Sequence, residues 1–264
     1  MRDLLIALSL GTIQGLTEFL PVSSSGHLVL CQGFLQGKWI GDVLFDVSLH
    51  LGTTLAIIVF FFKDIIGLIK GILPHYYNKE QMHLIICLFI TTLVTGIMGV
   101  LFKDEFEAMF SNSTLVACML LVTGLLTFFT DRFNIINSKK KSNDIKITNA
   151  VVIGLFQGFA IIPGISRSGS TIFAGVAGGL DRTLAARYSF IAAIPAIIGA
   201  AALEWSGEAA SLNMLHITGA AAAFIIGLIS LKFLVWTLRR RKFFIFSIYC
   251  WGIGSIYLII NALR

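Results

Sequence analysis

The segment QGLTEFLPVSSSGH, residues 14–27, gathers an amide, a carboxylate, three consecutive hydroxyls and an imidazole within a largely apolar chain. The amide and the carboxylate belong to Gln14 and Glu18, which are four residues apart, so a helix would place them on one face. A charged side chain within an apolar helix is costly and is therefore a functional candidate. The alternative is that Glu18 lies at an interfacial helix end and pairs with a lysine.

The hydroxyl and imidazole groups of this segment are candidates for a nucleophile and for an acid or base. Ser23, Ser24 and Ser25 offer hydroxyls for attack or for phosphate binding, and His27 can donate or accept a proton. Serines also cap helices, and we expect one of the three to cap the helix that follows. The other hydroxyls then remain available for chemistry.

A second segment, PGISRSGST at residues 163–171, has the composition of an anion-binding site. Arg167 presents a planar guanidinium that matches two phosphate oxygens at once, whereas a static ion pair with Glu18 is the structural alternative. The surrounding glycines and hydroxyls allow backbone N–H groups to bind a phosphate at a helix N-terminus. Ser166, Ser168 and Thr171 are among the hydroxyl residues of this segment.

The elements that must position these groups are membrane-spanning helices. The chain has 264 residues, of which 56% are hydrophobic and 13% are charged, and its mean hydropathy is +0.88. A helix of about 20 apolar residues crosses a bilayer core of ~30 Å. We therefore predict an all-α, polytopic membrane protein with six full transmembrane helices, at Phe45–Phe62, Leu84–Phe102, Leu115–Thr130, Tyr188–Leu203, Ile217–Leu238 and Phe243–Ile260.

The distribution of charge predicts the orientation of these spans. Acidic residues occupy the loops at 103–107 and 204–208. Basic loops remain cytoplasmic, which places both termini and the acidic loops on the extracytoplasmic side. Because this rule already accounts for the basic runs, we expect no nucleic-acid partner. The basic loops are 63–79, 132–146, 182–187 and 239–242.

Two similar segments lie in the two halves of the chain. GTIQGLTEFLPVSSSG (11–26) aligns without gaps on GLFQGFAIIPGISRSG (154–169), at a constant offset of 143 residues. An odd number of crossings separates the copies, which predicts an inverted-topology repeat within a single transmembrane domain, 1–264. Its halves are 1–131 and 147–264, and the basic cytoplasmic loop 132–146 joins them.

Each copy is predicted to form a re-entrant helical hairpin rather than a full span. Leu4–Leu20 begins a crossing, but Pro21 and the serines that follow stop the helix, and Val29–Leu35 is too short to complete a span. Val151–Ile162 and Thr171–Gly178 repeat this pattern. Broken helices of inverted repeats meet near the bilayer midplane, so we expect the two turns to face each other.

A carboxylate, an imidazole, hydroxyls and a guanidinium that meet inside a membrane favour hydrolysis of a lipid phosphate or diphosphate. A lipid-phosphate transporter or flippase is the alternative, because inverted repeats with broken helices are also typical of secondary carriers. Release of inorganic phosphate distinguishes the two functions. A purely structural membrane protein would have no need of buried Glu18, His27 and Arg167.

These residues resemble those of the bacterial undecaprenyl pyrophosphate phosphatase family of the bacitracin-resistance type, over essentially the full length. QGLTEFLPVSSSGH resembles the family's (E/Q)xxxE element with its serines and histidine, and PGISRSGST resembles its PGxSRSxxT element. The resemblance implies hydrolysis of undecaprenyl diphosphate to the monophosphate carrier of peptidoglycan synthesis, and bacitracin resistance. It also implies a multi-pass enzyme of the bacterial cell membrane whose active site opens to the extracytoplasmic side.

The resemblance further implies roles for single residues. Glu18 would bind a divalent cation, Mg²⁺ or Ca²⁺, or act as base, and Arg167 would clamp the diphosphate. Ser24 is a nucleophile candidate activated by His27, and attack by metal-bound water is the rival mechanism. The residues expected to bind substrate are Gln14, Ser23, Ser25, Ser166, Ser168 and Thr171.

The chain departs from the family pattern at Gln14, where many members have a second glutamate. An amide oxygen can bind a metal but cannot act as a base, so a metal site of Glu18 and Gln14 differs from a two-carboxylate site. Asp46 and His50, one turn apart on the first full span, are candidates for the missing ligands. The expected partners are undecaprenyl diphosphate and membrane lipids, with a homodimer left open.

Overall fold

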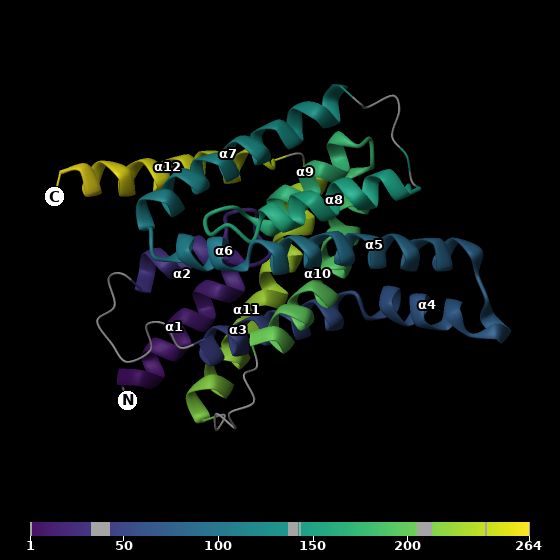
Figure 1. The fold of residues 1–264 in the computed structure, drawn as a ribbon, viewed down its shortest axis with the longest axis horizontal. Helices are drawn as coiled ribbons and strands as arrows, with labels where there is room; N and C mark the ends of the chain where they lie inside the picture. Colours follow the sequence, from purple (N-terminus) through teal and green to yellow (C-terminus); the bar gives the residue numbers. More distant parts are fainter. Residues whose placement is uncertain are drawn as a thin grey trace.

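The structure of the chain, a computed structural model, describes residues 2–32, 43–136, 142, 144–204, 213–240 and 242–263. Within these ranges the regular elements are all helices, as predicted, and Figure 1 shows how they are arranged. They are α1 (Arg2–Thr17), α2 (Ser24–Gln32), α3 (Val43–Phe60), α4 (Phe62–Ile72), η1 (Pro74–Tyr76), α5 (Lys79–Leu101), α6 (Lys103–Phe110), α7 (Ser113–Ile136), α8 (Ile147–Phe159), α9 (Arg167–Ala177), α10 (Arg182–Glu204), α11 (Met214–Arg239) and α12 (Phe244–Ala262).

Six of these helices, α3, α5, α7, α10, α11 and α12, are long and apolar enough to cross a membrane. Each of the six predicted spans corresponds to one of these helices, and each helix extends beyond its prediction at one end or both. For example, α5 begins at Lys79, because the Asn78 side chain accepts hydrogen bonds from the backbone of Glu80 and Gln81 and so caps an earlier start. The chain has the architecture of a multi-pass membrane protein.

Two short helices, α4 and α6, lie in segments that the charge pattern indicated as loops, and that interpretation is wrong for them. Each is shorter than a span and carries charged residues, so hydropathy does not reveal it. Helix α4 follows α3 after a break at Phe61 and packs against α5. Helix α6 joins the end of α5 to the start of α7.

Two helix–turn–helix units, α1–α2 and α8–α9, lie at the positions of the two predicted hairpins. In the first unit α1 ends at Thr17 rather than at Leu20. In the second unit α8 ends at Phe159 and α9 begins at Arg167. The turns are therefore residues 18–23 and 160–166.

The prediction that Ser24, Ser25 and Arg167 lie in the turns is wrong, because both outgoing helices begin earlier than expected. Two serines explain these starts. The Ser23 hydroxyl accepts a hydrogen bond from the N–H of Gly26 at 3.2 Å, and the Ser166 hydroxyl accepts one from the N–H of Gly169 at 3.1 Å. Each serine satisfies an N–H that has no partner within the helix, so each helix begins at the next residue.

Glycines set how closely the two units pack against long helices, the first against α11 and the second against α5. A Cβ atom at Gly11 would lie 2.3 Å from a carbonyl oxygen of α11, and one at Gly154 would lie 2.9 Å from a carbonyl oxygen of α5. One turn further along these helices, a Cβ atom at Gly15 would lie 2.7 Å from a carbonyl oxygen of α11, and one at Gly158 would lie 2.3 Å from the Met98 sulfur of α5. Small residues of this kind let helix backbones approach closely within a membrane.

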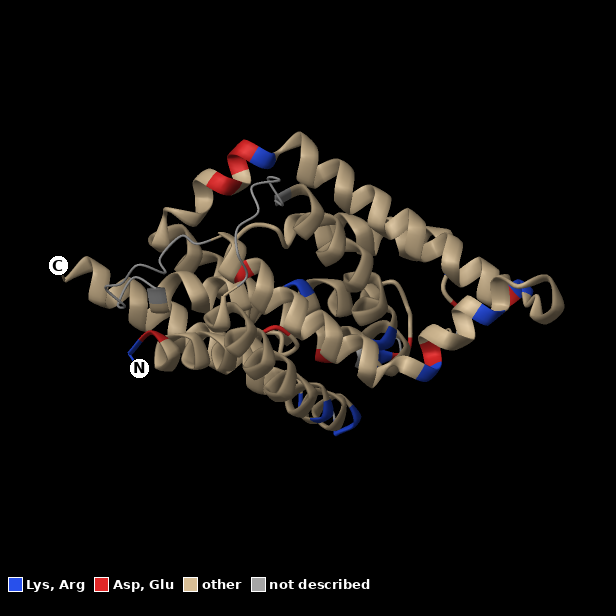
Figure 2. Cartoon of the chain, turned by 90° about the horizontal axis from the view of Figure 1, so that it is seen from below, with Lys and Arg blue, Asp and Glu red and all other residues tan. Residues whose placement is uncertain are grey.

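The outer surface is apolar and parts of the interior are polar, as expected of a protein surrounded by lipid. For instance, α5 exposes Phe89, Leu93 and Ile97 and buries Thr91 and Thr95. In Figure 2 the acidic residues of α6 lie on the side of the two chain ends, and many basic residues lie toward the other end. Four predicted features lie outside the described residues: the basic run 139–141, Glu208, Arg241 and residues 33–35 of the first outgoing helix.

Candidate active site

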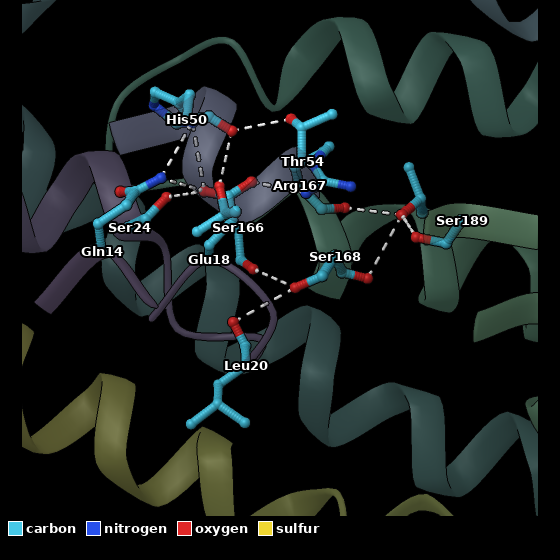
Figure 3. Close-up of polar contacts among 12 residues, drawn as sticks. Gln14, Glu18, Leu20, Ser24, His50, Thr54, Ser166, Arg167, Ser168 and Ser189 are labelled. Carbon is cyan, nitrogen blue, oxygen red and sulfur yellow. Dashed lines mark hydrogen bonds and ion pairs between the residues drawn. The ribbon is translucent and has the colours of Figure 1, made fainter. Parts of the chain in front are cut away.

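Glu18 is the centre of a cluster of side chains that joins the two helix–turn–helix units (Figure 3). It directly follows α1, and its N–H still donates to the carbonyl of Gln14 at 2.9 Å, so the two side chains share a face as predicted. The Glu18 side chain is only 5% exposed. A buried carboxylate needs hydrogen-bond donors in place of water, and Gln14 Nε2 supplies one to Oε2 at 3.1 Å.

Ser24 and Arg167 supply two further donors, one from each unit. Ser24 Oγ donates to Glu18 Oε2 at 2.5 Å, and Arg167 Nη2 donates to Glu18 Oε1 at 2.6 Å. Ser24 is the first residue of α2 and Arg167 the first residue of α9, at the same offset of 143 that relates the two segments. Equivalent positions at two helix N-termini therefore converge on one carboxylate, and the predicted meeting of these three residues is confirmed.

Two buried atoms of this cluster have no hydrogen-bond partner among the described residues, Gln14 Oε1 and Arg167 Nη1. A buried donor or acceptor that stays unpaired costs about 1–3 kcal/mol, which makes such atoms candidates for ligand binding. An unpaired guanidinium N–H is suited to an oxyanion, and an unpaired amide oxygen is suited to a hard cation. The cluster is therefore complementary in chemical type to an anion and a divalent cation together.

A cation in this cluster would have few protein ligands. The described part of the chain contains no group of three or more His, Cys, Asp or Glu residues that could hold a metal. Within the described cluster, the Glu18 carboxylate and the unpaired Gln14 amide oxygen are the protein oxygens suited to a cation, so the remaining ligands would be water and a bound phosphate. Mg²⁺ commonly binds through one or two carboxylates plus substrate phosphates, and the residues fit an ion of this type.

His50 of α3 adds a more exposed side chain to the cluster. Its Nδ1 lies 3.0 Å from Gln14 Nε2 and 3.6 Å from Glu18 Oε2, and its side chain is 32% exposed. Because the amide nitrogen can only donate, Nδ1 accepts, and the imidazole carries its proton on Nε2. The structure thus brings His50 to the site, and Asp46 lies one turn earlier on α3, partly exposed.

His27 makes contacts other than those its predicted role requires. Its Nδ1 lies 2.7 Å from the carbonyl oxygen of Ser23, and its Nε2 lies 2.8 Å from the hydroxyl of Tyr249. Both ring nitrogens are therefore engaged, while the Ser24 hydroxyl donates to Glu18. The base in contact with Ser24 is Glu18, and activation of Ser24 by His27 stays a prediction.

The other predicted hydroxyl residues contact the backbone and one another. Ser25 Oγ lies 3.3 Å from Ser23 Oγ, and its counterpart Ser168 lies 3.2 Å from Ser166 Oγ. Ser168 Oγ also donates to the carbonyl of Leu20 at 3.3 Å and so connects the two turns directly. These contacts give the hydroxyls a positioning role, and substrate binding by Ser23, Ser25, Ser166 and Ser168 stays a prediction.

Thr171 is fully buried and faces away from Glu18 toward α10. Its hydroxyl donates to the carbonyl of Arg167 at 2.8 Å and lies 2.5 Å from Ser189 Oγ. Thr123 of α7 holds the same turn from the other side, since its hydroxyl accepts from the N–H of Ser166 at 2.9 Å and donates to the carbonyl of Gly164 at 2.8 Å. Thr171 therefore orients the helix start that carries Arg167.

Sequence reasoning missed three residues that support the site, Thr123, Ser189 and Tyr249. All three lie on predicted spans, and all three engage site residues from other elements. The available signal was a polar side chain within an apolar span. That signal identifies neither the partner nor the side of the helix on which the partner lies.

Comparisons with known proteins place the chain among one group of relatives. A profile of the family described as "Bacitracin resistance protein BacA" matches residues 7–256. A protein named undecaprenyl-diphosphatase from Syntrophotalea carbinolica is 41% identical over 260 residues, which cover 97% of this chain and 98% of the relative. A protein of the same name from Halothermothrix orenii is 40% identical over 260 residues, which cover 96% of this chain and 96% of the relative. Another from Methanosphaera stadtmanae is 39% identical over 279 residues, which cover 99% of this chain and 99% of the relative.

Proposed function

Because the chain belongs to the family of bacitracin resistance protein BacA, we propose that it is an undecaprenyl-diphosphatase. It hydrolyses undecaprenyl diphosphate to undecaprenyl phosphate and inorganic phosphate, which recycles the lipid carrier of cell-wall synthesis and gives bacitracin resistance. The observation that carries the proposal is the meeting of Ser24 and Arg167 on the Glu18 carboxylate. This arrangement brings a hydroxyl, a carboxylate base and a guanidinium suited to phosphate together at one buried site.

The proposed reaction breaks the phosphoanhydride bond between the two phosphates. Glu18 accepts the proton of Ser24 across their 2.5 Å hydrogen bond while the serine oxygen attacks the terminal phosphorus. The lipid monophosphate leaves, and water then hydrolyses the phosphoserine and restores the serine hydroxyl. In the rival mechanism Glu18 removes the proton from a water molecule that attacks directly, and Ser24 only donates a hydrogen bond.

Arg167 binds the diphosphate in this proposal. Its Nη2 holds Glu18 Oε1 and its buried Nη1 has no partner among the described residues, so one N–H group is ready for a phosphate oxygen. The guanidinium would also stabilise the charge that develops on the bridging oxygen as the bond breaks. The N-termini of α2 and α9 add the positive ends of two helix dipoles at the same place.

A divalent cation, Mg²⁺ or Ca²⁺, is part of the proposed site. The Glu18 carboxylate and the unpaired Gln14 Oε1 would hold it. When bound, such an ion neutralises phosphate charge. Water and phosphate would supply the remaining ligands, and a contribution of Asp46 or His50 stays a prediction, since the described residues hold no group of three or more His, Cys, Asp or Glu that could bind a metal.

We also infer an inverted-topology repeat with two re-entrant hairpins, formed by α1–α2 and α8–α9. Its support is a set of matching contacts at the offset of 143 residues. Gly11 and Gly154 both lie against the backbone of a long helix, and Ser23 and Ser166 both cap the next helix three residues on. With basic loops cytoplasmic, both termini and the active site face the extracytoplasmic side of the bacterial cell membrane.

Phosphate release from a prenyl diphosphate tests the proposed function. Purified protein in detergent with Mg²⁺ should release inorganic phosphate, and Glu18→Gln should release none. Glu107→Gln, on the exposed surface of α6, is the matched control and should match the unmodified protein. Intact lipid binding without phosphate release would contradict the proposal and would favour the alternative, a lipid-phosphate flippase.

Ser24→Ala distinguishes the two mechanisms. Complete loss of phosphate release is expected if the serine oxygen attacks phosphorus, because the nucleophile is then absent. Partial activity is expected if water attacks, because Ser24 then supplies only one hydrogen bond. A phosphoserine at position 24, trapped by rapid acid quench and detected by mass spectrometry, would identify the first mechanism directly.

A further inference from the structure

Tyr249 of α12 contacts the first helix–turn–helix unit from the C-terminal end of the chain. Its hydroxyl lies 2.8 Å from His27 Nε2, and the two rings are almost parallel, with an angle of 10° and centroids 5.5 Å apart. Tyr249 is 43% exposed, whereas His27 is only 9% exposed. The tyrosine therefore covers the histidine and supplies the hydrogen-bond partner of its Nε2.

The two contacts of His27 determine where its proton lies. A carbonyl oxygen can only accept a hydrogen bond, so the contact of 2.7 Å to Ser23 O requires a proton on Nδ1. In the neutral ring Nε2 then carries a lone pair, and the Tyr249 hydroxyl donates to it. The hydroxyl thus selects the form of His27 that binds the Ser23 carbonyl.

That carbonyl belongs to a residue with an unfavourable backbone conformation. Ser23 has φ +68°, a left-handed conformation that costs a non-glycine residue roughly 1–2 kcal/mol. Its carbonyl oxygen accepts two hydrogen bonds, from the N–H of His27 at 3.2 Å and from the imidazole at 2.7 Å. The second of these bonds comes from the imidazole side chain of His27.

The second unit provides an internal comparison. Its capping serine, Ser166, has φ −76°, and the residue at the His27 position is Ser170, which contacts the Ser166 carbonyl through its backbone N–H alone. The left-handed serine thus occurs in the unit that has the histidine and the tyrosine. Its conformation immediately precedes Ser24 and sets the direction from which the Ser24 hydroxyl reaches Glu18.

We propose that Tyr249 is a positioning residue for the phosphatase reaction, which acts through His27 and the Ser23 backbone to hold Ser24 against Glu18. This inference rests on the proposed function of the site. It assigns His27 to the support of the serine, and it makes the last helix of the chain part of the active-site framework. Tyr249 itself contacts no reacting atom in this role.

Tyr249→Phe tests the proposal because it retains the stacked ring and removes only the hydroxyl. We expect kcat for phosphate release to fall by about tenfold or more with little change in KM, since loss of a supporting partner typically costs 10–100-fold while Arg167 remains in place. Tyr257→Phe, two turns further along α12, is the matched control and should leave kcat unchanged. An unchanged kcat in Tyr249→Phe would overturn the proposal and leave the phosphatase function standing.

A double-mutant cycle with His27→Ala separates positioning from general destabilisation. If Tyr249 acts through His27, the double variant should be no slower than His27→Ala alone, because the tyrosine then has nothing to hold. If the two losses multiply, Tyr249 acts by another route and the proposal is wrong. Unfolding temperatures of all variants in the same detergent show whether the losses follow from misfolding.

The protonation form of His27 can be tested without any measurement of activity. In protein labelled with ¹⁵N at histidine, the His27 signals, assigned with a His27→Gln variant, should report a single form protonated at Nδ1. Tyr249→Phe should shift them toward a mixture of the two neutral forms. Identical His27 signals in both proteins would overturn the inference, whatever the wild-type protein does with a prenyl diphosphate.

Discussion

At the scale of single residues, the site depends on one carboxylate that binds groups from three helices. Glu18 accepts hydrogen bonds from Gln14, Ser24 and Arg167 while it is almost completely buried. Removal of one partner from a buried ion pair commonly costs 3–5 kcal/mol, because the remaining charge is left uncompensated. The ion pair between Glu18 and Arg167 is one alternative predicted from the sequence, and the structure contains it.

Arg167→Lys should abolish most phosphate release, although it retains the positive charge. A lysine ammonium is a single point of charge and cannot bind Glu18 and a phosphate through two fixed N–H groups. We expect kcat/KM to fall by about 10²–10³-fold, the typical loss when a donor to the transition state is removed. Arg132→Lys, an exposed arginine at the end of α7, is the control. Near-normal activity in Arg167→Lys would contradict the diphosphate clamp.

Gln14→Leu should weaken binding of the divalent cation, because it removes the unpaired amide oxygen of Gln14 that is proposed to bind the ion. We expect the Mg²⁺ concentration for half-maximal activity to rise by about tenfold or more, and Mn²⁺ binding followed by electron paramagnetic resonance to weaken in parallel. The second readout does not depend on turnover. Unaltered metal binding in Gln14→Leu would remove Gln14 from the proposed metal site.

At the scale of elements, the positions of α1 and α8 depend on glycines that face neighbouring backbones. Helix α1 carries Gln14 and leads into Glu18, and α8 leads into the turn before Arg167, so the packing of both helices positions the site. Gly11 of α1 lies so close to α11 that even a methyl group does not fit, whereas a Cβ atom at Gly252 of α12 would meet no other atom within 4 Å. The same Gly→Ala substitution at these two positions therefore places a methyl group in a crowded site and in an open one.

Gly11→Ala should destabilise the protein and Gly252→Ala should not. Overpacking costs about 1–3 kcal/mol, whereas an exposed helical Gly→Ala change is neutral or favourable by up to about 1 kcal/mol. We expect a lower unfolding temperature and lower kcat for Gly11→Ala, because α1 must move away from α11 and carries Gln14 and Glu18 with it. Equal unfolding temperatures of the two variants would show that the close contact is not needed.

The sequence predicts some of these elements far better than others, for physical reasons. The six spans are evident because a run of about 20 apolar residues has few alternatives to crossing a bilayer. The sequence places the start of α2 too late, because SSSG is typical of a turn, whereas Ser23 in fact caps a helix that includes the other serines. Helix α4 was missed because eleven residues with three charges match no membrane pattern.

The same contrast holds within the candidate site. The meeting of Glu18 with Arg167 could be predicted from the proposed repeat, in which equivalent turns of two similar halves come together. The partner of His27 could not be predicted, since Tyr249 is 222 residues away and no spacing relates them. His50 was predicted only as one of two candidates, because helical spacing gives the face of α3 but not what the face contacts.

At the scale of the whole molecule, the charge distribution predicts which ends of the helices face the cytoplasm. Single cysteines can test this in a variant that lacks the four native cysteines. A cysteine at Glu105, exposed on α6, should react with a membrane-impermeant maleimide in intact cells. A cysteine at Tyr76, 61% exposed beside α4, should react only after the membrane is opened. The reverse pattern would invert the proposed orientation of the active site.

The equivalence of Ser24 and Arg167 has a consequence for how such a molecule can be assembled. Two identical half-length chains related by a twofold axis would carry the same residue at both helix starts, and so would present either two hydroxyls or two guanidiniums. The first pair would lack a cation for the phosphate and the second would lack a nucleophile. A site with a hydroxyl at one helix start and a guanidinium at the other therefore requires two copies that differ at this position. The proposed chemistry depends on a difference between the two segments, at a position that their alignment makes equivalent.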